Sequence, residues 1–268
     1  MSKNDVRMRG FLRRTPVPIL LSLIDQHCPK LPAESIPVTE ACGRVLAETV
    51  TAPGDVPHFD RAAMDGYAVR GEETFGANAY NPIPLQVVGQ SMPGKPFVGE
   101  VLPGSAVRIM TGAPMPQGAD AVLMAELAEE TGDFIQATEA VPPERHVGKV
   151  GEDVRSGDLL FREGRRLRPQ DVGMLASVGI PEVAVARKPT VELLITGSGL
   201  LAPGAQPTGV QIVDSDSVML RILVERDGGE LLDIRHLPDD REPLRKALLD
   251  STAEVVIVTG GTSVGLED

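Results

Sequence analysis

The chain has 268 residues, of which 42% are hydrophobic and only 3% aromatic, and its formal net charge is −12. An acidic chain with few aromatic rings lacks the positive field and the stacking surfaces that nucleic acids need, so we expect no nucleic-acid partner. No apolar stretch has the length of a membrane span, which favours a cytoplasmic protein of about two domains without a membrane partner. Cys28 and Cys42 have no metal-binding spacing, and we expect each to be a small buried residue.

The first two thirds of the chain predict a mixed architecture. Thr15 and Pro16 are typical of a helix start, and apolar residues recur at helical spacing from 19 to 24. From residue 58 to 144, proline and glycine separate short apolar runs at 85–88, 106–110 and 121–124, which is typical of a β-rich domain. A helix opening at Pro169 and a strand over 182–186 follow. We predict that residues 1–57 and 145–188 form one discontinuous, elongated domain, into which the β-rich domain of 58–144 is inserted.

Strands and helices alternate after Pro189. Apolar strands are predicted over 191–196, 231–234 and 255–258, and helices over 216–227 and 241–249. On the first of these helices, Val218, Met219, Ile222 and Leu223 are expected to share one face. The alternation predicts a parallel sheet with helices on both faces, a three-layer α/β domain over 189–268. The fold class is therefore multidomain, with α+β and α/β parts. Because the chain ends directly after the third strand, we expect this last domain to be incomplete.

Two Gly-rich loops follow predicted strands, at the edge where parallel sheets bind ligands. One contains Gly197 and Ser198, and the other runs from Gly260 to Gly265. The second loop offers backbone N–H groups and two hydroxyls to an oxyanion or a phosphate, although a plain tight turn would use the same glycines. Asp268 could hold a cation beside it or be an ordinary solvent-exposed carboxylate.

Four further acidic or turn positions have alternative interpretations. Asp214 or Ser215 could cap the helix that follows, and a carboxylate at this edge would also suit Mg²⁺. Asp65 and Thr111 each precede a glycine, so a turn is the default interpretation.

The sequence places two carboxylates side by side at Glu152 and Asp153. Adjacent side chains of an extended chain point in opposite directions. We therefore expect no acid/base pair at these two residues.

Four strings resemble the molybdopterin molybdotransferase family, which includes bacterial MoeA enzymes and the E domain of gephyrin. They are FDRAAMDGYAV (59–69), RIMTGAPMPQGADAV (108–122), VGKVGEDVRSGDLL (147–160) and VTGGTSVGLED (258–268). They occur in the family's order, and the resemblance covers nearly the whole chain from about Thr15 onward. The AMDGYA and IMTGAP strings are highly specific for this family.

The resemblance implies an Mg²⁺-dependent transferase that inserts molybdate into adenylylated molybdopterin and releases AMP. It implies an elongated homodimer whose active cleft lies between subunits, with the adenylylating enzyme and molybdoenzymes as further partners. A non-catalytic molybdopterin-binding or scaffolding module is the alternative.

Site residues follow from the motif positions that match the family. The catalytic residues would be Asp65, Thr111 and Asp153, and Asp268 would lie by the metal or the diphosphate. The molybdopterin-binding residues would be Thr196, Gly197, Ser198, Asp214, Ser215, Gly260, Gly261, Thr262, Ser263 and Gly265.

The chain also departs from the family. Where the family has an acidic pair after Thr196-Gly197, this chain has Ser198 and Gly199. The family's Asp-Ser-Asn is here Asp-Ser-Asp over 214–216. The chain ends before the family's molybdate loop and its C-terminal β-barrel, so the resemblance implies a C-terminally truncated chain without the residues that grip molybdate.

Overall fold

The computed structural model describes residues 15–260, whose contacts divide the chain into two compact units. Among the described residues, the unit that we call the α/β unit comprises 15–48, Glu163–Val172 and 181–260. The β-rich unit comprises Thr49–Arg162 and Gly173–Ile180. Each unit is therefore built from segments that are far apart in the sequence. The three predicted domains divide the chain more finely, and their boundaries stay a prediction.

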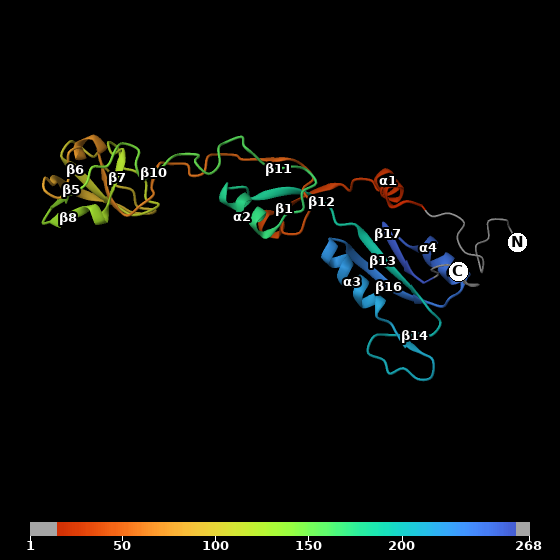
Figure 1. Ribbon diagram of the computed structural model, residues 1–268. Helices are drawn as coiled ribbons and strands as arrows, with labels where there is room; N and C mark the ends of the chain where they lie inside the picture. Colours follow the sequence, from red (N-terminus) through yellow and green to blue (C-terminus); the bar gives the residue numbers. More distant parts are fainter. Residues whose placement is uncertain (1–14, 261–268) are drawn as a thin grey trace. The chain divides into compact units, whose positions relative to one another are not determined.

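A six-stranded sheet forms most of the β-rich unit (Figure 1). In spatial order its strands are β7 (Ala121–Met124), β4 (Gly66–Val69), β6 (Ser105–Ile109), β5 (Ile83–Ser91), β9 (Phe134–Ala137) and β8 (Ala128–Thr131). All neighbours are antiparallel except β5 and β6. The predicted apolar runs fall in β5, β6 and β7, so the β-rich character of this region is confirmed.

The half of this sheet that β7, β4 and β6 form is buried on both faces. Tyr67 and Leu123 belong to one hydrophobic cluster, whereas their neighbours Ala68 and Val122 belong to another. Successive side chains of a strand alternate between faces, so a strand covered on both sides needs a continuous apolar run. That requirement explains why these strands lack an alternating pattern in the sequence.

Short antiparallel pairs connect distant segments of the β-rich unit. They join β2 (Val50–Thr51) to β11 (Leu159–Phe161) and β3 (Arg61–Ala62) to β10 (Val147–Gly148). The 3₁₀ turns η2 (Gly71–Thr74) and η3 (Ala125–Leu127) complete this unit, and α2 (Pro169–Ser177) crosses the boundary between the units. The pairing of β3 with β10 places the 59–69 and 147–160 strings side by side.

A three-stranded parallel sheet forms the centre of the α/β unit (Figure 1). Its order is β16 (Glu230–Leu237), β13 (Thr190–Thr196) and β17 (Val255–Thr259). Val224 of α3 (Asp216–Asp227) packs on the face that carries Leu193. On the opposite face, Arg235 donates to the carbonyl of Ala247 in α4 (Arg241–Asp250) at 2.9 Å. The predicted three-layer α/β fold is confirmed.

The remaining elements of the α/β unit are short. They are α1 (Val17–His27), β1 (Ala33–Pro37), η1 (Val38–Glu40), β12 (Glu182–Ala186), β14 (Leu200–Leu201) and β15 (Ile212–Val213). β1 pairs antiparallel with β12, and β14 pairs parallel with β15. The strand predicted over 182–186 is confirmed at both ends. Within residues 15–260, every helix is too short or too polar to cross a lipid bilayer.

The apolar face expected on α3 is not its buried face, and the burial predicted for the two cysteines was wrong. Val218, Met219 and Ile222 are exposed, because α3 turns its Ser217 and Val224 side to the sheet. Apolar residues surround most of this helix, so their spacing does not select the buried face. Both cysteines are also exposed rather than buried.

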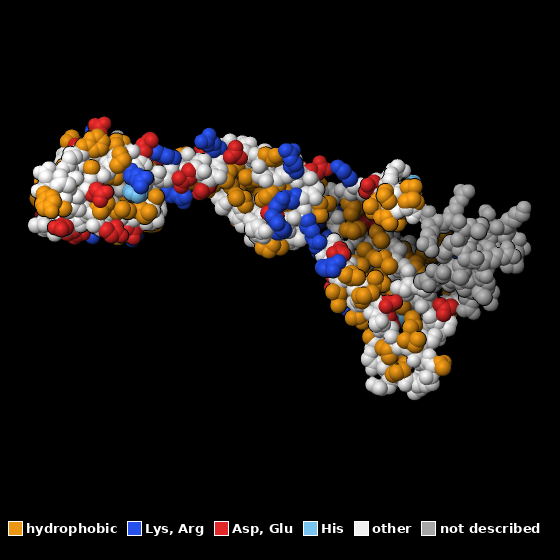
Figure 2. Space-filling model, in the orientation of Figure 1, with side chains coloured by type: hydrophobic (Ala, Val, Ile, Leu, Met, Phe, Trp, Pro, Cys, Tyr) orange, Lys and Arg blue, Asp and Glu red, His pale blue; other side chains and the backbone are white. Residues whose placement is uncertain are grey.

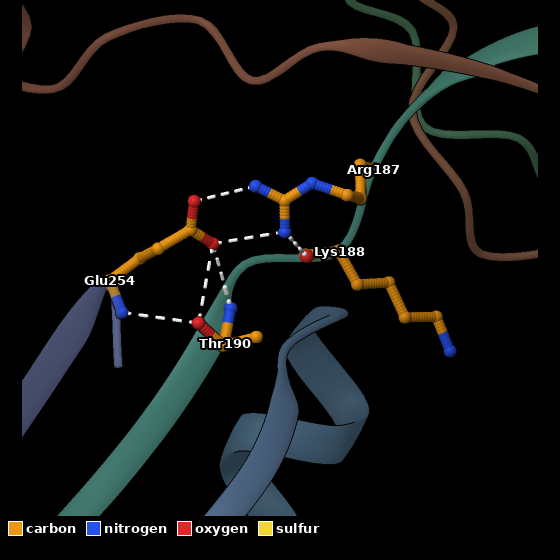
Figure 3. Close-up of polar contacts among 4 residues, drawn as sticks. All are labelled: Arg187, Lys188, Thr190 and Glu254. Carbon is orange, nitrogen blue, oxygen red and sulfur yellow. Dashed lines mark hydrogen bonds and ion pairs between the residues drawn. The ribbon is translucent and has the colours of Figure 1, made fainter. Parts of the chain in front are cut away.

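Hydrogen bonds among polar residues join β13 to β17 at the amino-terminal edge of the parallel sheet (Figure 3). Glu254, just before β17, accepts hydrogen bonds from the guanidinium of Arg187 and from the backbone N–H of Thr190, each at 3.0 Å. Its own N–H donates to the Thr190 hydroxyl at 3.1 Å. These contacts, that of Arg187 above all, lower the pKa of Glu254 to about 2. We call Arg187, Thr190 and Glu254 the amino-edge clamp.

Candidate functional site

The β-rich unit brings two of the predicted catalytic residues together. Asp65 precedes β4 and Thr111 follows β6, and the antiparallel pairing of Gly66 with Ile109 makes them neighbours. One carboxylate oxygen of Asp65 accepts both the backbone N–H and the hydroxyl of Thr111, each at 2.7 Å. These two donors lower the pKa of Asp65, the backbone bond having the larger effect. The pair therefore presents an ionised, exposed carboxylate in a fixed orientation.

Gly66 keeps Asp65 in this position. A Cβ at residue 66 would lie 2.0 Å from the carbonyl oxygen of Leu123 in β7. No side chain fits at that distance, so the Asp-Gly dipeptide is a requirement of strand packing as well as of the turn.

Asp153 lies in a different cluster. One guanidinium nitrogen of Arg61 donates to Glu152 at 2.9 Å and to Asp153 at 3.2 Å. The expectation that the two carboxylates diverge was wrong, since residues 151–153 form a turn rather than an extended strand. Sequence reasoning missed Arg61, although it lies within the 59–69 string. Among the described residues, no hydrogen bond or ion pair links this cluster to Asp65.

The carboxyl ends of β13, β16 and β17 form a second polar region, which we call the carboxyl edge. The Thr196 hydroxyl donates to the carbonyl of Thr259 at 2.6 Å. Gly260 follows with a φ of +99°, and a Cβ there would lie 2.0 Å from the hydroxyl oxygen of Thr196. The glycine at 260 is therefore needed both for its backbone angle and for the close approach of the two strands.

Two hydrogen bonds hold Ser198 against Asp239, a residue that the sequence analysis missed. Its backbone N–H donates to the carboxylate of Asp239 at 3.0 Å, and the N–H of Asp239 donates to the Ser198 hydroxyl oxygen at 3.2 Å. The neighbouring Gly197 donates to the carbonyl of Leu237 at 3.0 Å. These bonds fix the loop after β13 against the end of β16.

Asp214 is buried at the start of α3. It accepts the backbone N–H of Ser217 at 3.0 Å and lies 2.7 Å from Nε2 of His236. Asp214 therefore caps the helix, whereas Ser215 makes no side-chain cap bond. Burial alone would raise the pKa of Asp214, but the hydrogen bonds from Ser217 and His236 outweigh it and lower this pKa.

His236 is the second residue of this edge that the sequence analysis missed. The predicted strand stopped at Ile234, where the apolar run ends, but β16 continues to Leu237. His236 is two residues past Ile234 and thus on the same face of the strand. That alternation is the signal that could have identified it.

The predicted ligand loop and metal site lie largely outside the described residues. This applies to Gly261, Thr262, Ser263, Gly265 and Asp268. Within residues 15–260, no group of three His, Cys, Asp or Glu side chains is arranged to hold a metal ion. The Mg²⁺ site therefore stays a prediction.

A cavity of about 340 Å³ opens on the β-rich unit. Its lining is mainly apolar, with three polar side chains, Glu139, Arg145 and His146. None of the predicted catalytic residues lines it, so the cavity does not mark the candidate site.

Comparisons with known proteins cover almost the whole described chain. Residues 15–179 match the family model described as the MoeA N-terminal region (domain I and II). Residues 192–268 match a model described as a "probable molybdopterin binding domain".

Named relatives and a solved structure agree with these matches. The molybdopterin molybdenumtransferase of Haemophilus influenzae is 39% identical over 88% of this chain, and molybdopterin molybdenumtransferase 2 of Mycobacterium tuberculosis is 36% identical over 86%. The chain spans 58% of the length of each. A crystal structure of the molybdopterin biosynthesis moeA protein of Pyrococcus horikoshii OT3 superposes with a TM-score of 0.82 at 40% identity, covering 92% of this chain and 67% of that one.

Proposed function

This chain belongs to the MoeA family, and on that premise we propose that it acts in molybdenum cofactor biosynthesis as a molybdopterin molybdotransferase. The reaction would insert molybdate into adenylylated molybdopterin and release AMP. The observation that carries the proposal is the carboxyl edge, where Thr196, Ser198 and Asp214 gather at one end of a parallel sheet. This is the edge at which sheets of this kind bind their ligands.

The carboxyl edge suits a phosphate-bearing pterin. The fixed loop after β13 holds the Ser198 hydroxyl at the end of the strand, and α3 begins beside it with a positive helix dipole. In the proposal, these groups hold and orient the molybdopterin substrate.

The β-rich unit would supply the catalytic carboxylates. Asp65 has a fixed orientation and is ionised at neutral pH. Its carboxylate can therefore accept a proton or orient a water molecule. We propose that Asp65, Thr111 and Asp153 act together with the carboxyl edge of a second protomer in a homodimer. The described carboxylates do not form a metal site by themselves, so we assign no step to Mg²⁺, whose proposed ligand remains Asp268.

The organisation proposed from the sequence is retained with this function. A discontinuous domain of residues 1–57 and 145–188 would carry the inserted β-rich domain of 58–144, followed by the molybdopterin-binding domain from 189 onward. The family description of residues 15–179 as domains I and II supports two domains within that region. We also propose the cytoplasm as the site of action, where the adenylylating enzyme and the molybdoenzymes would be its partners.

Release of AMP tests the proposal directly. The natural gene product that contains this chain is incubated with adenylylated molybdopterin and molybdate, and AMP and pterin-bound molybdenum are measured. We expect both products, and we expect Asp65→Asn to lower the rate by about a hundredfold because the variant loses a positioned charge. The matched control is Asp133→Asn, which changes an exposed turn residue between β8 and β9. Tight binding of the pterin without AMP release would instead support a scaffolding module.

A further inference from the structure

His236 is held at the carboxyl edge by a buried carboxylate. The register pairs it with Ile195, whose side chain packs in the cluster under α3, so the imidazole lies on the α3 face. Its Nε2 is 2.7 Å from Oδ2 of Asp214. The side chain of Asp214 is 1% exposed, whereas that of His236 is 41% exposed. The imidazole therefore has one anchored side and one open side.

The open side of the ring carries an unused nitrogen. Within residues 15–260, Nδ1 of His236 has no hydrogen-bond partner. A buried aspartate that accepts from one ring nitrogen fixes the orientation of the ring, and in an imidazolium both nitrogens donate. Asp214 is itself fixed by the Ser217 N–H at the start of α3, so the orientation of the ring is set by the fold.

Charge identifies the kind of group that this nitrogen would meet. The polar side chains that hydrogen bonds fix at this edge, those of Thr196, Ser198, Asp214 and Asp239, carry no positive charge. Arg241 lies nearby, exposed at the first position of α4. Asp239 is engaged with the N–H of Ser198 and leaves its negative charge at the edge. Among the side chains fixed at this edge, only that of His236 can offer a positive charge to an anionic ligand group.

The neighbouring arginine cannot take this role. Arg235 lies on the opposite face of β16, where it pairs with the buried Glu192 and donates to the carbonyl of Ala247 at 2.9 Å. Its charge is thus neutralised beneath α4.

We propose that His236 is a binding residue that donates a hydrogen bond from Nδ1 to the phosphate of molybdopterin, while Asp214 acts as its positioning residue. The inference rests on the proposed function, because it assigns a role within the same ligand edge. The positive end of the α3 dipole adds to the attraction for the phosphate. No bond is made or broken in this role, which is to place the substrate.

The test compares two ligands and two proteins. Binding of molybdopterin and of its dephosphorylated form is measured by pterin fluorescence for the natural protein and for His236→Gln. A glutamine amide can still reach Asp214 from the Nε2 position, but it offers nothing at the Nδ1 position. We expect His236→Gln to bind molybdopterin about 10- to 100-fold more weakly, the usual effect of losing one hydrogen bond to a charged group. Binding of the dephosphorylated pterin should be unchanged.

Control variants separate binding from folding. His27→Gln changes an exposed histidine of α1 and should preserve the preference for the phosphorylated ligand. Asp214→Asn keeps a carbonyl oxygen for the Ser217 N–H but removes the charge that anchors the ring. It should therefore reduce the phosphate preference while His236 is still present.

The outcomes distinguish the two proposals. If the natural protein binds neither pterin, the proposed function fails. If it prefers the phosphorylated pterin and His236→Gln keeps the same preference, the proposed function stands and the role of His236 is overturned. Equal weakening of both ligands by His236→Gln would indicate a purely structural histidine and would also overturn the inference.

Discussion

The two ends of the parallel sheet in the α/β unit use polar side chains in different ways. At the amino-terminal end, Glu254 is surrounded by Arg187 and Thr190, and its carboxylate is fully engaged in the amino-edge clamp (Figure 3). At the carboxyl edge, Asp214 is also engaged, but through His236, which has an exposed side chain with a free nitrogen. Both ends contain an ordered carboxylate, yet only one of them presents a group to a ligand.

The difference lies in what neutralises the carboxylate. A guanidinium that donates two parallel bonds uses its charge within the clamp. An imidazole that donates through one nitrogen has a second nitrogen on the opposite side of the ring. The capacity of a polar cluster to bind a ligand therefore depends on which donors and acceptors have no partner within the cluster. The number of charges in the cluster does not decide it.

The space-filling view adds a second contrast. Hydrophobic side chains gather on the surface around α3 (Figure 2). They include Met219 and Ile222, which are 52% and 58% exposed. The apolar surface thus lies on the side of α3 turned away from the sheet, and the polar ligand edge lies at its start.

The largest expected effect comes from filling the space at Gly260. Gly260→Val would place Cβ against the Thr196 hydroxyl and force a β-branched residue into a positive φ. We expect a loss of at least about 3 kcal/mol in the free energy of unfolding and loss of pterin binding. Gly228→Ala is the control, since Gly228 has a similar φ of +95° but nothing within 4 Å of its Cβ position. An equal loss in both variants, measured by urea unfolding, would contradict the close approach at the carboxyl edge.

The next effect in size is the loss of Asp214. Asp214→Ala removes the cap of α3 and leaves the Ser217 N–H and His236 without their acceptor. We expect a loss of about 2–3 kcal/mol in the free energy of unfolding. Asp216→Ala, at the exposed first position of the same helix, should cost less than about 1 kcal/mol. Similar costs for the two variants, again measured by urea unfolding, would argue against the buried Asp214 network.

A smaller effect is expected at the amino-edge clamp. Glu254→Gln should lower the melting temperature by a few degrees without changing pterin affinity, because the clamp lies at the opposite end of the strands. The folded-state pKa of Glu254 is lowered from 4.5 to about 2. Its stabilising contribution is therefore fully present above pH 4.5 and is lost as the pH falls toward 2.

Melting curves at two pH values check this prediction. The difference in melting temperature between the natural protein and Glu254→Gln should be present at pH 7 and smaller near about pH 3. A difference that grows on acidification would show that the clamp carboxylate is not ionised as described.

The smallest structural effect is expected from adding a charge at the carboxyl edge. A Cβ at residue 199 has nothing within 4 Å, so Gly199→Glu should fit without loss of stability. The family resemblance implies an acidic residue here, and we therefore expect the variant to raise the rate of AMP release several-fold. Gln206→Glu, at an exposed position of the loop between β14 and β15, adds the same charge without replacing a glycine. An unchanged rate in Gly199→Glu would refute the role inferred for this position.

Much of the fold could be predicted from the sequence because long apolar runs mark buried strands. β12 and α3 have the predicted bounds, and β13 and β17 each extend one predicted strand by a residue. β16 was predicted too short, because polar residues such as Arg235 and His236 follow its apolar run. These residues belong to a strand because its neighbours hydrogen-bond to it, and this is information that local sequence does not contain.

The candidate site was predicted only in part, because local sequence does not contain the contacts between distant segments. Motif positions identified Asp65 and Thr111, and strand pairing brings them together. The partners Arg61, His236 and Asp239 were missed, since each is defined by a contact between segments that are distant in the sequence. A single sequence shows which residues can bind a ligand, whereas the fold decides which of them keep a free donor.

The most direct test of the account is to titrate the isotopically labelled protein with molybdopterin and follow backbone and imidazole resonances by NMR. We predict that binding shifts the signals of Thr196, Ser198 and His236 at the carboxyl edge and leaves those of Thr190 and Glu254 unchanged. Shifts confined to the amino-edge clamp or to the cavity of the β-rich unit would contradict the assignment of the ligand site.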